Sequence, residues 1–328
     1  MKPHLLTTLA MCAVFACGLS SCKKSSNLPA AAAAGDLEAV KSMLENKADV
    51  NAKEDKLGST ALVEAATNGH TEVVTTLIIA GADLNIKDKR EETALIRAAR
   101  NGHTETVAAI LAYRDANGNP LTDVNNTSKS GTTALHAAAW AGHPATILVL
   151  LNNGANPNQA DLNEGTPLTL AAHKKTDTPE AAAKQTEVIK TLLDKGANVN
   201  ALDVLGRSAL MYAAENNNAT NVALLLEKQA DPNLHDRTGR TALLIATEAG
   251  HADIAKTLVA AGATMSPKDL ESYINRTIHT IPNIVELLKN TGLNLAAKGE
   301  DGKSALAIAT EKRHQKTVEA LQAAGITE

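Results

Sequence analysis

The sequence feature that most constrains the fold is a short motif that returns along almost the whole chain. A Thr or Ser is followed by Ala or Pro and then by Leu, as in Thr60-Ala61-Leu62, Thr93-Ala94-Leu95, Thr133-Ala134-Leu135, Thr166-Pro167-Leu168, Ser208-Ala209-Leu210, Thr241-Ala242-Leu243 and Ser304-Ala305-Leu306. The spacings between successive copies are 33, 40, 33, 42, 33 and 63 residues, so they follow a 33-residue period with two insertions and one shortened double step. Such a period predicts a stack of similar units, each of which buries its apolar face against the next.

Each unit contains the signals of two short helices. The Thr or Ser that opens the motif can accept hydrogen bonds from the free N–H groups of a first helix, and Pro167 suits the first turn. Paired alanines such as Ala65 and Ala66 allow this helix to approach its neighbours, and Gly69 ends it where a positive φ is favoured. Apolar residues at helical spacing within residues 73–78 predict the second helix.

The second helix is followed by a glycine and then by a loop that carries an asparagine. Gly81, Gly154, Gly196 and Gly262 occupy the glycine position. Asparagine side chains often bond to nearby backbone in turns, so we expect each of them to tie the loop to its own backbone. These asparagines are Asn51, Asn85, Asn125, Asn158, Asn200 and Asn233.

The full pattern resembles the ankyrin repeat, whose signature is T-P-L-H-x-A. It reads Thr-Ala-Leu-x-x-Ala-Ala-x-x-Gly-His, then Val-x-x-Leu-Leu, then Gly-Ala-Asp/Asn-x-Asn, and it fits residues 59–91, 92–131, 132–164, 165–206, 207–239 and 240–269. Residues 28–58 resemble an N-terminal cap, 270–302 a divergent repeat and 303–328 a C-terminal cap. The resemblance implies an all-α solenoid of about nine helix-turn-helix modules, joined by hairpin-like loops, over residues 28–328.

The first 22 residues carry the features of an export signal. Lys2 precedes an uncharged apolar stretch over residues 5–19, which is shorter than the roughly 20 residues of a membrane span but fits a secretory signal. The end of this segment, Leu19-Ser20-Ser21-Cys22, resembles the bacterial lipobox. This resemblance implies a signal peptide at residues 1–21, a lipid anchor such as palmitate on Cys22, and a tether at 22–27. The alternative is an ordinary signal peptide with a coincidental cysteine.

The cysteine positions and the following lysine extend this interpretation. All three cysteines, Cys12, Cys17 and Cys22, lie in the first 22 residues and only Cys22 would remain after cleavage, so we expect no disulfide in the mature domain. By resemblance to lipoprotein sorting, Lys23 after the cysteine implies the outer membrane, facing the periplasm. We therefore expect a protein of the bacterial cell envelope that is anchored to a membrane without crossing it.

Charge and aromatic content argue against nucleic-acid binding. The chain has 32 Lys+Arg against 36 Asp+Glu, a net charge of −4, with one Trp, three Tyr and one Phe. A nucleic-acid binder needs excess positive charge for phosphates and aromatic surfaces for base stacking. We expect no nucleic-acid partner.

The sequence also offers no catalytic, cofactor or metal motif. His70, His103, His143 and His251 recur in the Gly-His position, a module or more apart, which is too far to share a metal ion. Gly302-Lys303-Ser304 resembles the end of a phosphate-binding loop, but the first glycine of that motif is replaced by Ala297. We expect no cofactor, no metal and no enzymatic activity.

Candidate partner-binding residues follow from the resemblance, because ankyrin proteins use the hairpin tips and the exposed side of the first helix. The first-helix candidates are Arg100, Trp140, Glu215 and Glu248, and the tip candidates are Arg90, Leu162, Val204, Leu205 and Arg237. Tryptophan and arginine dominate binding hot spots, although Trp140 could instead cover neighbouring apolar side chains. Val204 and Leu205, beside Leu202, predict an exposed apolar tip. Insertions near residues 114–124 and 175–184 are expected on opposite edges, the second as a longer turn between two helices.

Together these features predict a monomeric, membrane-tethered scaffold or adaptor that binds a protein partner in the bacterial envelope. The alternative is an immunity or inhibitor protein that neutralises an envelope-acting toxin or enzyme. A third possibility is a small-molecule binder or an enzyme. The sequence does not separate an adaptor from an inhibitor.

Overall fold

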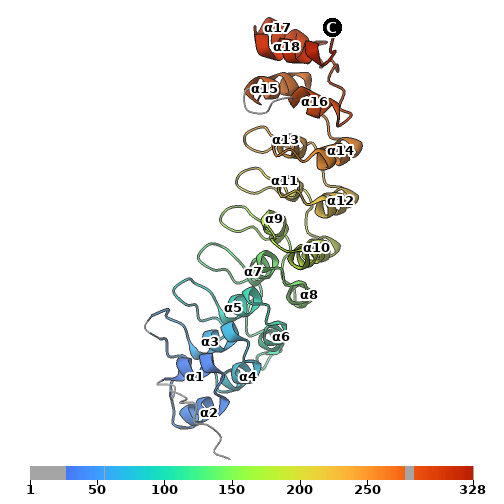
Figure 1. Ribbon diagram of the computed structural model, residues 1–328. Helices are drawn as coiled ribbons and strands as arrows, with labels where there is room; N and C mark the ends of the chain where they lie inside the picture. The colour runs from blue at the N-terminus through green and yellow to red at the C-terminus, as the bar shows by residue number, and fades with distance from the viewer. Residues whose placement is uncertain (1–26, 55, 278–283, 328) are drawn as a thin grey trace, which may run out of the picture.

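The computed structural model describes residues 27–54, 56–277 and 284–327, and these form a solenoid of stacked helix pairs (Figure 1). The expected signal peptide and Cys22 lie outside the described residues. Within the described ranges, β structure is limited to isolated bridges, so the predicted all-α fold is confirmed. The helices are α1 (Leu28–Ala34), α2 (Leu37–Glu45), α3 (Ala61–Asn68), α4 (Thr71–Ile79), α5 (Ala94–Arg100), α6 (Thr104–Ala112), α7 (Ala134–Ala141), α8 (Pro144–Asn152), α9 (Pro167–His173), α10 (Pro179–Asp194), α11 (Ala209–Glu215), α12 (Ala219–Glu227), α13 (Ala242–Glu248), α14 (Ala252–Ala260), α15 (Pro267–Thr277), α16 (Ile284–Lys289), α17 (Ala305–Glu311) and α18 (Gln315–Ala323).

The helices form two layers, and the loops project from one of them. From α3 to α14, the odd-numbered helices lie next to the hairpin-like loops and the even-numbered helices lie behind them (Figure 1). The predicted helix starts are confirmed, because the opening Thr or Ser accepts a hydrogen bond from the backbone N–H three residues later. These capping residues are Thr60, Thr93, Thr133, Thr166, Ser208, Thr241 and Ser304.

Small side chains allow the layers to pack closely. Ala65 and Ala66 of α3 are fully buried, and Leu62 fills the space between modules. One hydrophobic cluster runs from Leu28 to Ala263. A second cluster joins Leu244 to side chains of the C-terminal modules, up to Leu321. The core is therefore continuous along most of the solenoid and changes after Ala263.

The recurring histidines join each module to the one before it. The His103 ring donates from Nε2 to Thr67 O at 3.0 Å, at the end of the preceding odd-numbered helix. His70 and His143 make equivalent bonds from Nε2, and the His251 ring donates from Nδ1 to Ala214 O at 3.0 Å. Where the second insertion removes the histidine, Gln185 Nε2 donates to Ala139 O at 3.0 Å and to Ala171 O at 2.8 Å. These side chains thus satisfy helix-end carbonyls.

The role predicted for the loop asparagines is wrong in one respect. Their side chains reach the next module rather than their own loop. Asn158 Oδ1 accepts from Asn198 N at 2.7 Å, and its Nδ2 donates to Gly196 O at 2.9 Å. The residue two positions before each of these asparagines closes the loop instead. For example, Asn156 Oδ1 accepts a hydrogen bond from Asn158 N. The asparagines therefore set the register between modules.

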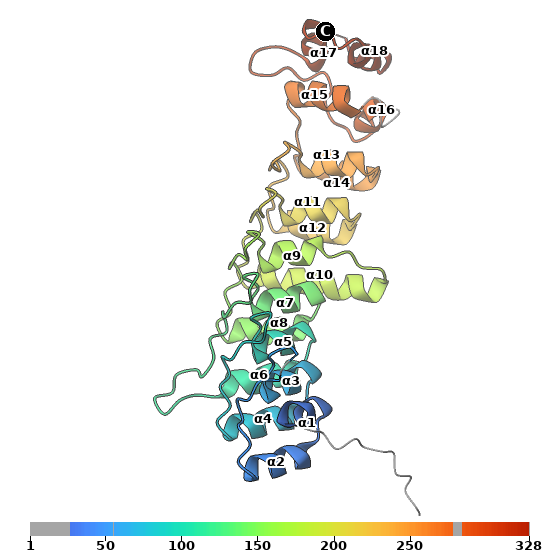
Figure 2. The ribbon, with the colours of Figure 1, turned by 90° about the vertical axis from the view of Figure 1, so that its left-hand side faces the viewer.

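The second insertion also differs from its prediction. Only residues 174–178 form a turn, whereas residues 179–184 extend α10, which has 16 residues against nine in α8. Thr178 caps this helix and Pro179 occupies its first turn, so the sequence continues as helix. In Figure 2 the extended end of α10 and the loop formed by the first insertion project to opposite sides, as expected.

A buried ion cluster docks the C-terminal helices onto α15. Glu271 is fully buried, and its carboxylate contacts Lys312 Nζ at 2.8 Å and also His314 Nδ1. Burial alone would raise the pKa of Glu271, but hydrogen bonds from Lys312 and His314 outweigh burial and lower that pKa below its usual value.

Candidate functional site

The inner surface of the solenoid is the face formed by the last turns of the odd-numbered helices and the hairpin tips. All the hairpins project toward the same side (Figure 1). The residue seven positions after each helix-capping residue repeats along this surface. The residues in this row are Thr67, Arg100, Trp140, His173, Glu215, Glu248 and Glu311. The structure therefore places all four first-helix candidates in one row.

Three of these candidates form ion pairs with a residue eight positions earlier in the chain. Arg100 contacts the largely buried Glu92. Glu215 pairs with Arg207 at 2.9 Å, and Glu248 pairs with Arg240 at 3.4 Å. Because each charge is matched within its own module, these positions offer a partner little unbalanced charge.

The two central modules lack this ion pair. Trp140 and His173 occupy the row there, and the residues eight positions earlier are Thr132 and Gly165, which have no charge. The Trp140 and His173 ring centroids lie 5.9 Å apart at an edge-to-face angle, and His173 stacks on Tyr212 at 4.3 Å. An aromatic row thus crosses three modules. His173 and Tyr212 were not among the sequence candidates, although His173 shares the repeat position of Trp140.

Trp140 is partly covered within its own chain. The Lys174 Nζ lies 4.9 Å from the centroid of the Trp140 ring, a cation–π distance. The residue is nevertheless 38% exposed. Trp140 therefore packs on its neighbours and still presents part of its ring to the inner surface.

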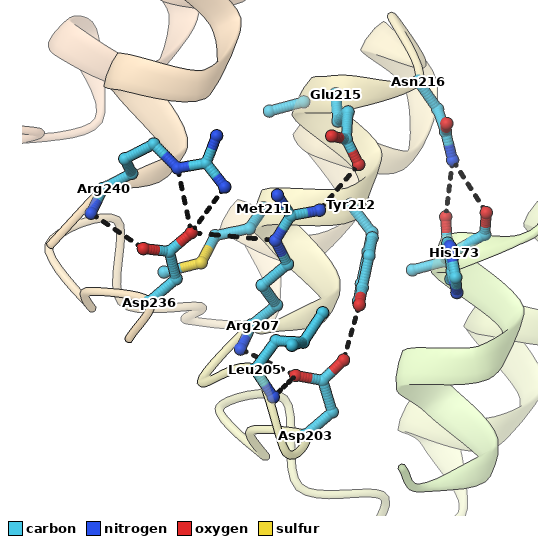
Figure 3. A network of polar contacts seen from close by, with 12 residues as sticks. His173, Asp203, Leu205, Arg207, Met211, Tyr212, Glu215, Asn216, Asp236 and Arg240 are labelled. Atoms are coloured by element: carbon cyan, nitrogen blue, oxygen red, sulfur yellow. Dashed lines mark hydrogen bonds and ion pairs between the residues drawn. The ribbon is translucent and has the colours of Figure 1, made fainter. Parts of the chain in front are cut away.

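A polar network fixes the base of the next hairpins (Figure 3). Tyr212 donates its hydroxyl proton to Asp203 Oδ2 at 2.5 Å. Burial, followed by the bond to Asp203, raises the pKa of Tyr212, so the phenol stays neutral. Arg207 lies between Glu215 and Asp236, with its Nε 3.7 Å from Asp236 Oδ2. The bonds of this network thus hold the aromatic row in place.

Asp236 connects this network to the following module. Arg240 Nη2 lies 2.9 Å from Asp236 Oδ2, and Thr238 donates from its backbone N and from Oγ1 to Asp236 Oδ1. Burial alone would raise the pKa of Asp236, but the hydrogen bonds from Thr238 and Arg240 lower it overall. The carboxylate therefore remains charged and closes its own hairpin turn.

The hairpin tips are linked to one another by backbone hydrogen bonds. Leu162 N donates to Ser130 O at 3.0 Å, Val204 N to Asn163 O at 2.8 Å and Arg237 N to Leu205 O at 2.9 Å. Leu162 is 74% exposed and Leu205 is 53% exposed.

The remaining tip candidates differ in how far their side chains are exposed to solvent. Arg90 and Arg237 are exposed, as expected. Val204 is partly buried, which corrects the prediction that it would be open to solvent. The apolar part of the tips therefore rests on Leu162 and Leu205.

The opposite edge of the solenoid has two open hollows, of about 430 and 220 Å³, separated by the turn at residues 174–178. Lys174, Lys175, Thr176 and Asp177 contribute to both. In the part of the chain that the structure describes, no group of three or more His, Cys, Asp or Glu side chains is placed to hold a metal ion. Across the same residues, no helix is both long enough and apolar enough to cross a bilayer.

Comparison with known proteins agrees with this geometry. The family model for ankyrin repeats (three copies) matches residues 8–88, 28–121, 68–161, 120–178 and 179–269. The ankyrin repeat domain of Bcl-3, described as a unique member of the IkappaB protein family, superimposes with a TM-score of 0.56 at 26% identity. That match covers 67% of this chain and 93% of the Bcl-3 domain.

Sequence relatives share the repeats over part of their length. The human mitochondrial disaggregase is 31% identical over 226 residues, which is 63% of this chain and 28% of that protein. The bovine mitochondrial disaggregase is 36% identical over 152 residues, or 46% of this chain and 22% of the relative. Human neurogenic locus notch homolog protein 1 is 31% identical over 179 residues, covering 54% of this chain and 5% of that protein. The chain thus spans about a quarter of the length of the disaggregases that it matches.

The ankyrin fold is typically a non-enzymatic module for protein–protein interaction, and an exposed inner surface on a rigid stack is consistent with that use. The stacked helix pairs, the hairpins and the family match together show that the chain belongs to the ankyrin-repeat family.

Proposed function

We propose that this protein is a non-enzymatic scaffold of the bacterial envelope that holds a protein partner on its inner surface. The observation that carries the proposal is the central aromatic row, in which Trp140 is 38% exposed although it stands on a rigid helix among ion-paired neighbours. Partly exposed tryptophans on rigid frameworks are frequent binding hot spots. Exposed Leu162 and Leu205 lie at the tips of the same modules and add apolar surface.

We further propose that Cys22 carries a lipid that tethers the solenoid to the outer membrane, facing the periplasm, as a monomer. This part rests on the sequence Leu19-Ser20-Ser21-Cys22 and on the polar residues 23–27 that follow it. A single acyl chain binds membranes only reversibly, whereas more than one chain gives stable anchoring. A tether of this kind would keep the inner surface available to a partner in the same compartment.

The anchor is tested by fractionating cells that express Cys22→Ser. We expect the wild-type chain to float with outer-membrane vesicles and Cys22→Ser to lose both lipidation and flotation. Cys17→Ser, in the same leader, is the matched control and should behave as wild type. Flotation of Cys22→Ser at the wild-type level would contradict the lipoprotein proposal.

The partner is tested by affinity capture from envelope extracts with the full chain as bait, followed by mass spectrometry. Trp140→Ala should weaken the captured complex by about 2 kcal/mol or more, the size of a hot-spot loss. Leu148→Ser, on the outer helix α8, is the control at a side chain that is 43% exposed. Equal binding by Trp140→Ala and wild type would show that the aromatic row does not contact the partner. A captured enzyme that loses activity on binding would instead indicate the inhibitor function.

A further inference from the structure

The inner surface changes its chemical character in the central modules. On either side, the Glu92–Arg100, Arg207–Glu215 and Arg240–Glu248 pairs match positive with negative charge. At the centre, Thr132 with Trp140 and Gly165 with His173 leave that position without an ion pair. An apolar side chain from a partner can be buried there without breaking an ion pair, and breaking one is costly when one charge is buried.

The hairpin tips carry an ordered sequence of side chains along the solenoid. The two residues that follow the turn-closing residue of each hairpin stand at its tip. In chain order these tip residues are Lys56 and Leu57, Lys89 and Arg90, Lys129 and Ser130, Leu162 and Asn163, Val204 and Leu205, Arg237 and Thr238, and Glu300 and Asp301. Lysine and arginine thus recur in the three tips before Leu162, the next two tips are apolar, Arg237 follows them, and the last hairpin is acidic.

The buried carboxylates closest to Arg90 in sequence are already paired with other arginines. Asp88 and Glu92 are buried, and Arg97 and Arg100 of α5 already pair with them. Glu91 is the exposed carboxylate of that hairpin, and it follows the exposed Arg90. This positive stretch lies on a chain whose net charge is −4.

We propose that the partner presents a segment with carboxylates at one end and a bulky apolar anchor at the other. The anchor lies over Leu162 and Leu205, and the carboxylates lie over Lys129 and Arg90. The inference rests on the proposed scaffold function and specifies the chemistry of its partner. The charge along the tips favours this direction, because Lys129 and Arg90 follow one another on one side of the apolar tips, whereas on the other side Arg237 is followed by the acidic hairpin of Glu300 and Asp301.

The spacing within that segment follows from the stack. Adjacent modules are separated by about 10 Å, the usual distance between packed helices, and an extended chain rises about 3.3 Å per residue. The anchor and the carboxylate over Lys129 are therefore about three residues apart. The carboxylate over Arg90 lies about six residues from the anchor.

The test is a selection of phage-displayed random peptides against the purified full-length chain. We expect the selected peptides to share a bulky apolar residue with acidic residues about three and six positions away. Leu162→Ser/Leu205→Ser should weaken the selected peptides by at least about tenfold, the loss expected of hot-spot side chains. Arg90→Glu/Lys129→Glu should select basic residues in place of acidic ones.

The matched control is Ile79→Ser/Leu148→Ser, which removes side chains that are 78% and 43% exposed on the outer helices α4 and α8. This variant should bind the selected peptides as wild type does. Peptides without an acidic bias, or equal binding by the Leu162→Ser/Leu205→Ser and outer-helix variants, would overturn the inference. Binding to phosphatidylglycerol vesicles that Leu162→Ser/Leu205→Ser abolishes would also overturn it, since the tips would then be a membrane surface.

The same variants separate this inference from the scaffold function. Capture of a partner that depends on Trp140 but not on the tip residues leaves the scaffold function standing and contradicts the partner chemistry proposed here. Loss of the captured partner with Leu162→Ser/Leu205→Ser and with Arg90→Glu/Lys129→Glu, but not with the outer-helix control, supports both.

Discussion

At the residue scale, two glycines with the same backbone conformation differ in what surrounds them. Gly69 and Gly250 both follow an odd-numbered helix, with φ angles of 75° and 76°. A Cβ at Gly69 would lie 2.5 Å from His103 Nδ1 of the next module, whereas a Cβ at Gly250 would meet nothing within 4 Å. Glycine is therefore required at position 69 both by the positive φ and by the close approach of the next module.

This pair gives the first prediction. Gly250→Ala should cost about 1 kcal/mol, because Ala resists a positive φ. Gly69→Ala should cost about 1 kcal/mol more, since the His103 ring must move and loses its bond to Thr67 O. Urea unfolding of both variants measures the difference, and equal losses would show that the ring accommodates a methyl group at no cost.

A buried histidine gives a second prediction at the same scale. His136 is fully buried, with Nδ1 3.3 Å from Thr133 N and Nε2 3.1 Å from Gly165 O. Burial lowers its pKa, so the folded chain holds a neutral ring. The unfolded chain binds a proton from about pH 6.5 downward. Stability is therefore present above that pH and is lost as the pH falls toward the folded pKa.

We expect the melting temperature of the wild-type chain to fall between about pH 7 and pH 5 through this linkage. His136→Gln should reduce that dependence, because glutamine does not titrate. His235→Gln, at an exposed histidine, is the control and should keep the wild-type slope. A slope that is identical in all three chains would contradict the assignment to His136.

At the element scale, the sequence predicts well those features that depend on residues close together in the chain. Thr60 accepts from Val63 N within one turn, so the start of α3 depends only on adjacent residues. Thr178 and Pro179 form the same pair of capping residue and first-turn proline as Thr166 and Pro167. The early start of α10 was therefore predictable from the sequence, although it lies in an insertion that interrupts the repeat.

Contacts between elements were harder to predict, for a physical reason. Asn158 bonds to Asn198, 40 residues away, only because the stacking places one loop beside the next. His173 lies on Trp140 only because one module stands above the other. Period and propensity do not determine these distances, so the asparagine bonds between modules and the aromatic row emerged only from the stack.

At the scale of the whole molecule, the two hydrophobic clusters predict uneven stability. The first cluster ends at Ala263, and the second connects to it through Leu244, with Met265 and Leu293 packed against both. A pocket of about 150 Å³ lies at this junction, beside Leu244 and Met265. Because each repeat is stabilised by its neighbours, a loosely packed junction separates the array into two cooperative blocks.

The last prediction is that the C-terminal block, residues 264–327, unfolds first. Circular dichroism should show two steps in urea, because both blocks are helical. The single tryptophan, Trp140, lies in the first block, so its fluorescence should report only the later step. Truncation after Ala263 should remove the earlier step and leave the later one. Light scattering controls for association through the uncovered Leu244. Coincident transitions by both probes in the full chain would show that the junction transmits cooperativity and that the solenoid unfolds as one unit.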